Sequence, residues 1–172
     1  MAKKAVWKNI ITHGIRSFFL PEYNSKLLLR LVVLLVVLPV LFLIFRPCFV
    51  AGESMAPAWN DGSFTFSYRF RYLFSPPERG DVVCISYFGR KMLFKRVIAL
   101  AGDTVEFKDG RLLVNGMIQR EEYVKFPCNW NIAPVTIRDG FCYVVGDNRS
   151  MDHREHKFGE VSLKRIVGGP LF

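Results

Sequence analysis

Two residues in separate parts of the chain could together form a nucleophile and its base. Ser54 lies in the segment Gly52-Glu53-Ser54-Met55-Ala56-Pro57, and a serine hydroxyl attacks well only when an adjacent base takes its proton. Lys95 lies in the apolar segment Met92-Leu93-Phe94-Lys95-Arg96-Val97-Ile98. Desolvation disfavours an ammonium and can lower a lysine pKa by several units from about 10.4. The pattern therefore indicates a serine nucleophile with an amine as its general base.

The three histidines provide an alternative base. His13 lies in the basic N-terminal region, whereas His153 and His156 flank a pair of charged residues. A Ser-His-Asp triad that uses one of the latter two with Asp147 or Asp152 stays open, although solvated loop histidines are the simpler interpretation. A His-x-x-His metal site would need a further cluster of ligands, and none accompanies it. We therefore expect no metal.

A long apolar segment precedes the candidate serine. Residues 31–45 are uninterrupted apolar residues, and residues 27–29 extend the run beyond Arg30. As a helix the stretch would span roughly 28 Å, close to the thickness of the bilayer hydrocarbon. Pro39 is tolerated in a membrane helix, and Arg30 could reach the headgroups. A cleaved targeting segment is the alternative, but residues 49–51 make a poor small-x-small cleavage site, so we expect a retained anchor.

The distribution of charge predicts how that anchor is oriented. The 172 residues carry a net charge of +9, of which the first 30 contribute +5. Basic flanks stay cytoplasmic, so residues 1–26 are predicted to be a basic cytoplasmic arm and residues 27–45 a single transmembrane helix. Residues 46–172 would then be an extracytoplasmic domain of a protein in the cytoplasmic membrane. No nucleic-acid-binding signature occurs, and we expect no DNA or RNA partner.

After the anchor, the sequence has the texture of strands and tight turns. Residues 64–74 alternate aromatic with other residues, which predicts one strand with an aromatic face, turned to the core or to the bilayer. Strands are also expected at 81–88, 91–100 and 141–145, with a hairpin at 105–114 and an Asn115-Gly116 turn. The fold class is therefore mainly β, a compact domain behind one N-terminal helix. For the four cysteines, buried free thiols are as plausible as a bridge, and Cys128 with Cys142 is the more plausible pair if a disulfide forms.

Four segments, taken in order, resemble a known family. They are Gly52-x-Ser54-Met55-x-Pro57, Gly80-Asp81-Val82-Val83, residues 95–103 and Gly146-Asp147-Asn148-Arg149. Together they look like the successive motifs of the bacterial type I signal peptidases. The resemblance implies a Ser/Lys endopeptidase with a signal-peptidase-like β fold and with neither a metal nor an organic cofactor. Its partners would be secretory precursors, cut after small residues at the bilayer surface.

The resemblance also implies roles for individual residues. Ser54 matches the nucleophile, Lys95 the general base, and Arg96 and Asp147 a structural ion pair. Further residues match the serine that orients the lysine, a supporting aspartate and its basic neighbour, in this order: Ser150, Asp152 and Arg154. Here Ser150 follows Arg149 directly, whereas the family usually has two residues between them, and His153 stands where a serine is usual.

The implied specificity requires shallow apolar pockets beside the nucleophile. The residues expected to line them are Val50, Ala51, Gly52, Met55 and Phe94. Three other interpretations remain at this point: a dedicated maturation peptidase for pilin or conjugative-transfer precursors, a self-cleaving repressor, and an inactive membrane-anchored binding or assembly module. The anchor argues against the repressor, and the presence of both Ser54 and Lys95 argues against the inactive module.

Overall fold

The computed structural model describes residues 25–86, 92–152, 154, 156–157 and 159–171. The chain divides into two compact units, Met1–Phe42 and Leu43–Phe172. Most of the predicted cytoplasmic arm, and the histidines at positions 13 and 153, lie outside the described residues.

The N-terminal unit contains most of helix α2 (Ser25–Ile44), which includes Pro39. Within the described part of the chain, α2 is the one helix long and apolar enough to cross a membrane. Its 20 residues correspond to about 30 Å of helix, the thickness of a bilayer core. The predicted span of 27–45 differs at its end, because Phe45 already begins the first strand.

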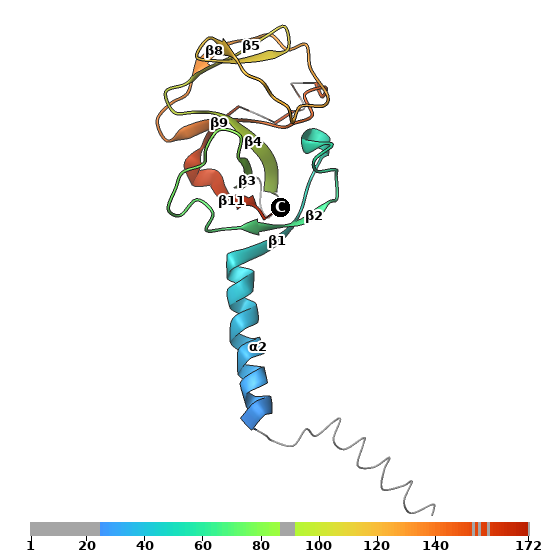
Figure 1. The fold of residues 1–172 in the computed structure, drawn as a ribbon, viewed down its shortest axis with the longest axis vertical. Coiled ribbons are helices and arrows are strands. Elements are labelled where there is room, and N and C mark those ends of the chain that lie inside the picture. The colour runs from blue at the N-terminus through green and yellow to red at the C-terminus, as the bar shows by residue number, and fades with distance from the viewer. Residues whose placement is uncertain (1–24, 87–91, 153, 155, 158, 172) are drawn as a thin grey trace, which may run out of the picture. The chain divides into compact units, whose positions relative to one another are not determined.

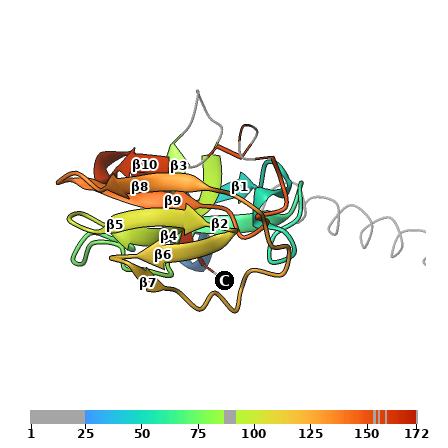
Figure 2. The same cartoon turned by 90° about the horizontal axis from the view of Figure 1, so that it is seen from above.

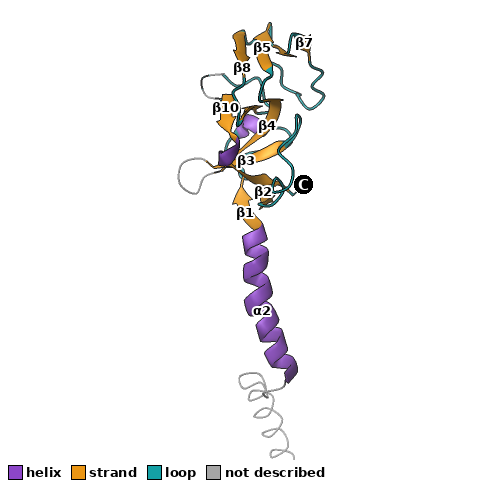
Figure 3. Ribbon diagram, turned by 90° about the vertical axis from the view of Figure 1, so that its left-hand side faces the viewer, coloured by secondary structure: helices purple, strands orange, loops and turns teal. Residues whose placement is uncertain are grey.

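The described strands of the second unit form two antiparallel sheets, which confirms the mainly β fold class (Figures 1 and 3). The larger sheet has the order β1-β2-β11-β3-β4-β9-β10. Its strands are β1 (Phe45–Phe49), β2 (Phe64–Tyr68), β3 (Val82–Ser86), β4 (Met92–Leu100), β9 (Phe141–Val145), β10 (Gly159–Ser162) and β11 (Ile166–Pro170). Two short 3-10 turns, η1 (Glu53–Met55) and η2 (Leu163–Arg165), complete this part of the domain.

The smaller sheet has the order β7-β6-β5-β8 and overlies strands β4 and β9 (Figure 2). Its strands are β5 (Thr104–Lys108), β6 (Arg111–Val114), β7 (Met117–Ile118) and β8 (Ile132–Thr136). The predicted hairpin is confirmed, with Lys108 opposite Arg111 across a two-residue turn. Asp109 and Gly110 both have positive φ angles there, as a tight hairpin turn requires.

Three apolar clusters fill the domain. The first lies between the two sheets and is centred on Phe107, Trp130 and Val145. A second cluster adjoins η1 and consists of Cys48, Val50, Met55, Cys84, Met92 and Phe94. The third joins β3, β4 and β9 through Val83, Val97 and Val144. Neighbouring residues of β3 enter different clusters, because successive side chains of a strand point to opposite faces.

The aromatic strand predicted at 64–74 is shorter in the structure, and of the two alternatives for its aromatic face the core is wrong. Strand β2 ends at Tyr68, and the chain then enters turns. The buried face carries Thr65 and Ser67, each 1% exposed, whereas Phe64 is exposed. The Phe64 ring instead stacks against Phe49 of the neighbouring strand, with centroids 5.4 Å apart. Alternation predicted the strand correctly, but it did not reveal which face was inside.

Of the two alternatives for the cysteines, the structure has free thiols and no Cys128–Cys142 bridge. All four cysteines are free. Cys142 is buried in the third cluster, whereas Cys128 packs against the first. Burial raises the pKa of the Cys142 thiol to about 11, which keeps it protonated and unreactive at neutral pH.

Candidate active site

Ser54 lies on the short turn η1, which follows the first strand of the domain. Gly52, just before the turn, has a φ of 86°, a conformation that favours glycine. Its N–H donates to Asp61 Oδ1 at 2.7 Å, which ties the start of the turn to the loop that returns towards β2. The Ser54 side chain is half-buried.

Lys95 lies in the middle of β4, opposite Val83 of β3. Only 2% of the residue is exposed. Its Nζ lies 2.6 Å from Ser54 Oγ, so the two side chains are brought together from positions 41 residues apart. Burial lowers the pKa of the Lys95 amine to about 8, while the charge of Asp147 raises it and that of Lys157 lowers it. The amine can therefore be neutral in a useful fraction of molecules near physiological pH.

The segment Gly146-Asp147-Asn148-Arg149 holds the Ser54 turn in place. Strand β9 ends opposite Arg96, with Val145 paired to it, so this segment begins beside the strand that carries Lys95. The Asn148 N–H donates to Ser54 O at 3.0 Å, and its Nδ2 donates to Glu53 O at 3.1 Å. A Cβ on Gly146 would lie 2.0 Å from Ser54 O. Glycine is therefore required by the close approach of the two backbones.

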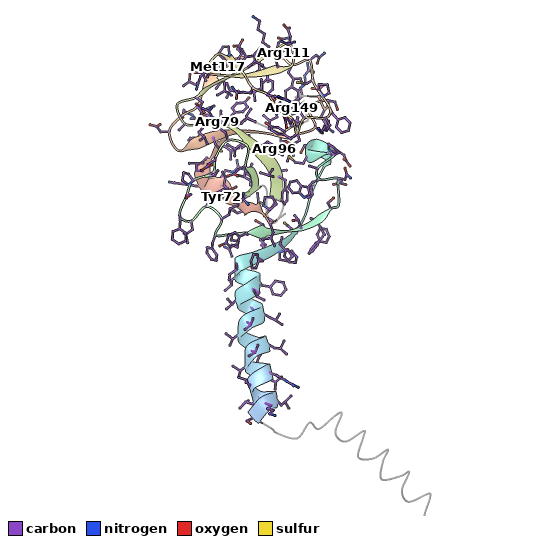
Figure 4. The ribbon with its side chains drawn as sticks, in the orientation of Figure 1. Tyr72, Arg79, Arg96, Arg111, Met117 and Arg149 are labelled. Carbon is purple, nitrogen blue, oxygen red and sulfur yellow. The ribbon has the colours of Figure 1, made fainter. Side chains whose placement is uncertain are left out.

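Arg96 and Asp147 form the ion pair that the resemblance implied. Arg96 Nε and Nη2 donate to Asp147 Oδ1 and Oδ2 at 2.8 and 2.6 Å. Asp147 is completely buried, and Arg96 also donates to Gly80 O at 2.6 Å. Such a two-pronged pair fixes both direction and distance. Through these bonds Arg96, which is labelled in Figure 4, connects β4 and the end of β9 to the Gly80 turn, one of the four motifs.

The structure does not bring Ser150 to the lysine. The Ser150 hydroxyl is exposed and donates to Asn148 Oδ1 at 2.7 Å. Arg149 is buried, and because Ser150 follows it directly, the serine is carried outwards. The expectation that Ser150 orients Lys95 is therefore corrected. Asp152 and Arg154 are both exposed, and the Arg154 N–H donates to Asp152 Oδ1 at 2.9 Å.

His156 is buried, which corrects the expectation of a solvated loop histidine. It is 1% exposed, packs edge-on against Trp130 with ring centroids 5.3 Å apart, and lies beside Gly146. Burial, followed by the charges of Lys95 and Arg149, lowers the pKa of its imidazole to about 4. The Ser54 hydroxyl meets Lys95 rather than this ring. Within the described residues, no group of three or more His, Cys, Asp or Glu side chains could hold a metal ion.

The five expected pocket residues separate into two groups. Val50, Met55 and Phe94 are buried in one cluster with Cys48, Cys84 and Met92. Ala51 and Gly52 are exposed between this cluster and the Ser54 turn. The cluster is thus a packed apolar region next to the serine, and Ala51 and Gly52 lie exposed at its edge.

Sequence reasoning missed two residues that contact this assembly. Glu121 pairs with Arg149, and Tyr123 lies against Arg96. Both residues precede β8 in a loop that contains no motif. The one available signal was Arg149 of the last motif, which had no assigned role and, if buried, would need an acidic partner.

Comparisons with known proteins agree with the order of the motifs. The family model described as signal peptidase, peptidase S26, matches residues 24–171. Signal peptidase I of Bacillus licheniformis is 34% identical over 158 residues, which cover 83% of this chain and 84% of that protein. Thylakoidal processing peptidase 1 of Arabidopsis thaliana is 30% identical over 139 residues, which are 74% of this chain but only 41% of the plant protein.

Among solved structures, a signal peptidase I from Enterococcus faecalis V583 is 28% identical, with a TM-score of 0.44. The match covers 54% of this chain and 95% of that one. The family match spans most of the chain, and the Bacillus relative is covered over most of its length. The resemblance inferred from the four motifs is thereby confirmed, and the chain belongs to the signal peptidase family, peptidase S26.

Proposed function

We propose that this protein is a membrane-anchored serine endopeptidase that removes N-terminal signal peptides from exported precursors. The observation that carries the proposal is the buried Lys95 amine, 2.6 Å from the Ser54 hydroxyl. Membership of the signal peptidase family supports the reaction class. The names of the Bacillus and Arabidopsis relatives, a signal peptidase and a processing peptidase, are consistent with precursor substrates.

In the proposed reaction, the neutral Lys95 amine accepts the Ser54 proton as Oγ attacks the scissile carbonyl carbon. Lys95 then returns that proton to the leaving amine of the mature protein, and an acyl-enzyme remains on Ser54. The same lysine then deprotonates a water molecule, which attacks the ester carbonyl carbon. The C–Oγ bond breaks, Lys95 returns the proton to Ser54 Oγ, and the signal peptide leaves with a free carboxyl group. With a pKa of about 8, about one lysine in ten is neutral at pH 7 and about nine in ten at pH 9.

The surroundings of the dyad support a preference for small side chains. Val50, Met55 and Phe94 are packed into one buried cluster, so a substrate side chain would be excluded from it. We propose instead that the side chain is received in a shallow recess at Ala51, which is exposed. An extended peptide could bind there as an added strand. Ser54, Lys95 and this recess are therefore the proposed catalytic and substrate-binding residues. Arg96 and Asp147 are proposed to support them, while Asp152 and Arg154 keep only the proposed role of an outer support.

The proposed topology follows from α2. Residues 27–44 of this helix would cross the cytoplasmic membrane once. The basic residues before them would stay in the cytoplasm, and the β domain would lie outside, where translocated precursors emerge. Attachment to the same bilayer would raise the effective concentration of a membrane-held signal peptide at the site.

The test is cleavage of a secretory precursor with a small-x-small site by the detergent-solubilised protein. Ser54→Ala and Lys95→Ala should each abolish cleavage, whereas Lys125→Ala, which removes an exposed lysine, should not. Ser150→Ala should lose less than about tenfold, because its hydroxyl contacts Asn148 and not the dyad. Cleavage that survives Lys95→Ala would refute the proposed base. No cleavage by the wild type of this or any other precursor would refute the function.

A further inference from the structure

A buried arginine next to the dyad is held by an acidic residue from a distant loop. Arg149 is 1% exposed. Its Nη1 and Nη2 donate to Glu121 Oε2 and Oε1 at 3.0 and 2.5 Å, and its Nε donates to Gly146 O at 2.9 Å. One guanidinium therefore ties the Glu121 loop to the start of the segment that holds the Ser54 turn.

The same loop also reaches the other arginine of the site. The Tyr123 hydroxyl donates to Glu121 Oε1 at 2.6 Å, and the Arg96 guanidinium lies 4.0 Å from the centroid of the Tyr123 ring. Burial and the nearby Glu121 raise the pKa of Tyr123, so its hydroxyl stays protonated and keeps donating. Arg96 in turn grips Asp147. Together these side-chain contacts form a closed network around the backbone of residues 146–149.

The backbone inside this network positions the nucleophile. Asn148 lies between the two gripped residues, pairs with Phe126 of the same loop in a parallel bridge, and donates two hydrogen bonds to the Ser54 turn. We propose that Glu121 and Tyr123 are positioning residues, which fix Asn148 and thereby hold Ser54 at proton-transfer distance from Lys95. This inference rests on the proposed roles of Ser54 and Lys95.

The hydrogen-bonding capacity of Glu121 explains why the network would break if this carboxylate were lost. A buried guanidinium needs a charged, hydrogen-bonded partner, and a carboxylate can accept two parallel N–H bonds from it. Glutamine has nearly the same size but offers one acceptor and no charge. Arg149 would then move to find another partner and draw Gly146 O with it. A displacement of about 1 Å at a catalytic group can lower the rate about 100-fold.

The first experiment measures precursor cleavage by Glu121→Gln, Tyr123→Phe and the control Glu122→Gln. Glu122 is adjacent but pairs at the surface, with its side chain 74% and that of Arg120 88% exposed. A serine-reactive acylating inhibitor counts the competent sites, so that kcat is expressed per folded molecule. We expect kcat to fall about 10- to 100-fold in Glu121→Gln, with KM changed less than about twofold. Tyr123→Phe, which keeps the ring over Arg96, should show a smaller loss, and Glu122→Gln none.

The second experiment does not depend on activity. Hydrogen exchange of the Asn148 amide is measured by NMR in a Ser54→Ala background, with and without Glu121→Gln. We expect faster exchange at Asn148 in the Glu121 variant but not in the Glu122 variant, while the strand amides of Val83 and Val144 keep their protection. If Glu121→Gln does not fold, the same comparison is made with Tyr123→Phe.

The outcomes separate this inference from the proposed function. A wild type that cleaves no precursor refutes the function. Hydrogen exchange of the Asn148 amide still decides whether the network fixes Asn148. A wild type that cleaves, with kcat per site equal in Glu121→Gln and Glu122→Gln, overturns the positioning role. Unchanged Asn148 exchange in Glu121→Gln overturns it as well.

Discussion

Replacing Lys95 with methionine should stabilise the domain at neutral pH while it removes the proposed base. The pKa of Lys95 is about 8 in the folded protein, against 10.5 for an ordinary lysine. The folded state therefore binds this proton more weakly than the unfolded state. A difference of about 2.5 pKa units corresponds to roughly 3 kcal/mol, at about 1.4 kcal/mol per unit. Below pH 8 this difference lowers the free energy of unfolding of the wild type, whereas the Lys95→Met protein has no ionisable group at this position and is not destabilised in this way.

The sign of the pH dependence follows from the same numbers. Between pH 8 and 10.5 the unfolded state carries more protons than the folded state, so the stability of the wild type rises with pH in this window. The advantage of Lys95→Met should therefore shrink by about 2.5 kcal/mol between pH 7 and pH 10.

Urea unfolding followed by tryptophan fluorescence, in one detergent at both pH values, measures the two free energies. Lys125→Met is the matched control, because its exposed lysine should give no pH-dependent difference. A Lys95→Met protein less stable than the wild type at pH 7 would refute the argument. So would an advantage of equal size at pH 7 and pH 10.

Three further substitutions and one control test the remaining parts of the site. Gly146→Ala places a Cβ 2.0 Å from Ser54 O and should lower kcat/KM at least about 100-fold, measured per competent site. Arg96→Met leaves a fully buried carboxylate without its partner and should lower the free energy of unfolding by about 3–5 kcal/mol. The control Arg138→Met removes an arginine whose side chain is 68% exposed, and it should leave the free energy of unfolding nearly unchanged in the same assay. Ala51→Trp should abolish precursor cleavage without a change in circular dichroism or in acylation by a small inhibitor; retained cleavage would contradict the assigned recess.

Local patterns predicted much of the fold. Alternation and turn residues were sufficient for the 105–114 hairpin and for the strands that begin near residues 82, 92 and 141. They did not predict which face of β2 turns to the interior, where Thr65 and Ser67 are buried. Burial there depends on which strands pair with β2, and pairing between distant segments leaves no trace in a local alternation.

The site was predictable where function is carried by residue type within a motif. Ser54 and Lys95 could be named because their motifs occur in order, and the structure places their side chains in contact. The motif could not show that Ser150 turns outwards, because that depends on the burial of the preceding Arg149. Glu121 was not predictable either: its partner lies 28 residues away, and nothing in its own segment marks it as buried.

The most direct test of the Ser54–Lys95 assignment is the pH dependence of acylation by a serine-reactive inhibitor, with the modified residue identified by mass spectrometry. The account predicts an adduct on Ser54, a rate that is half-maximal at about pH 8 because Lys95 must be neutral, and no adduct in Lys95→Ala. An adduct on another residue would contradict it. So would acylation that persists in Lys95→Ala with a midpoint near the ordinary histidine value of about 6.5.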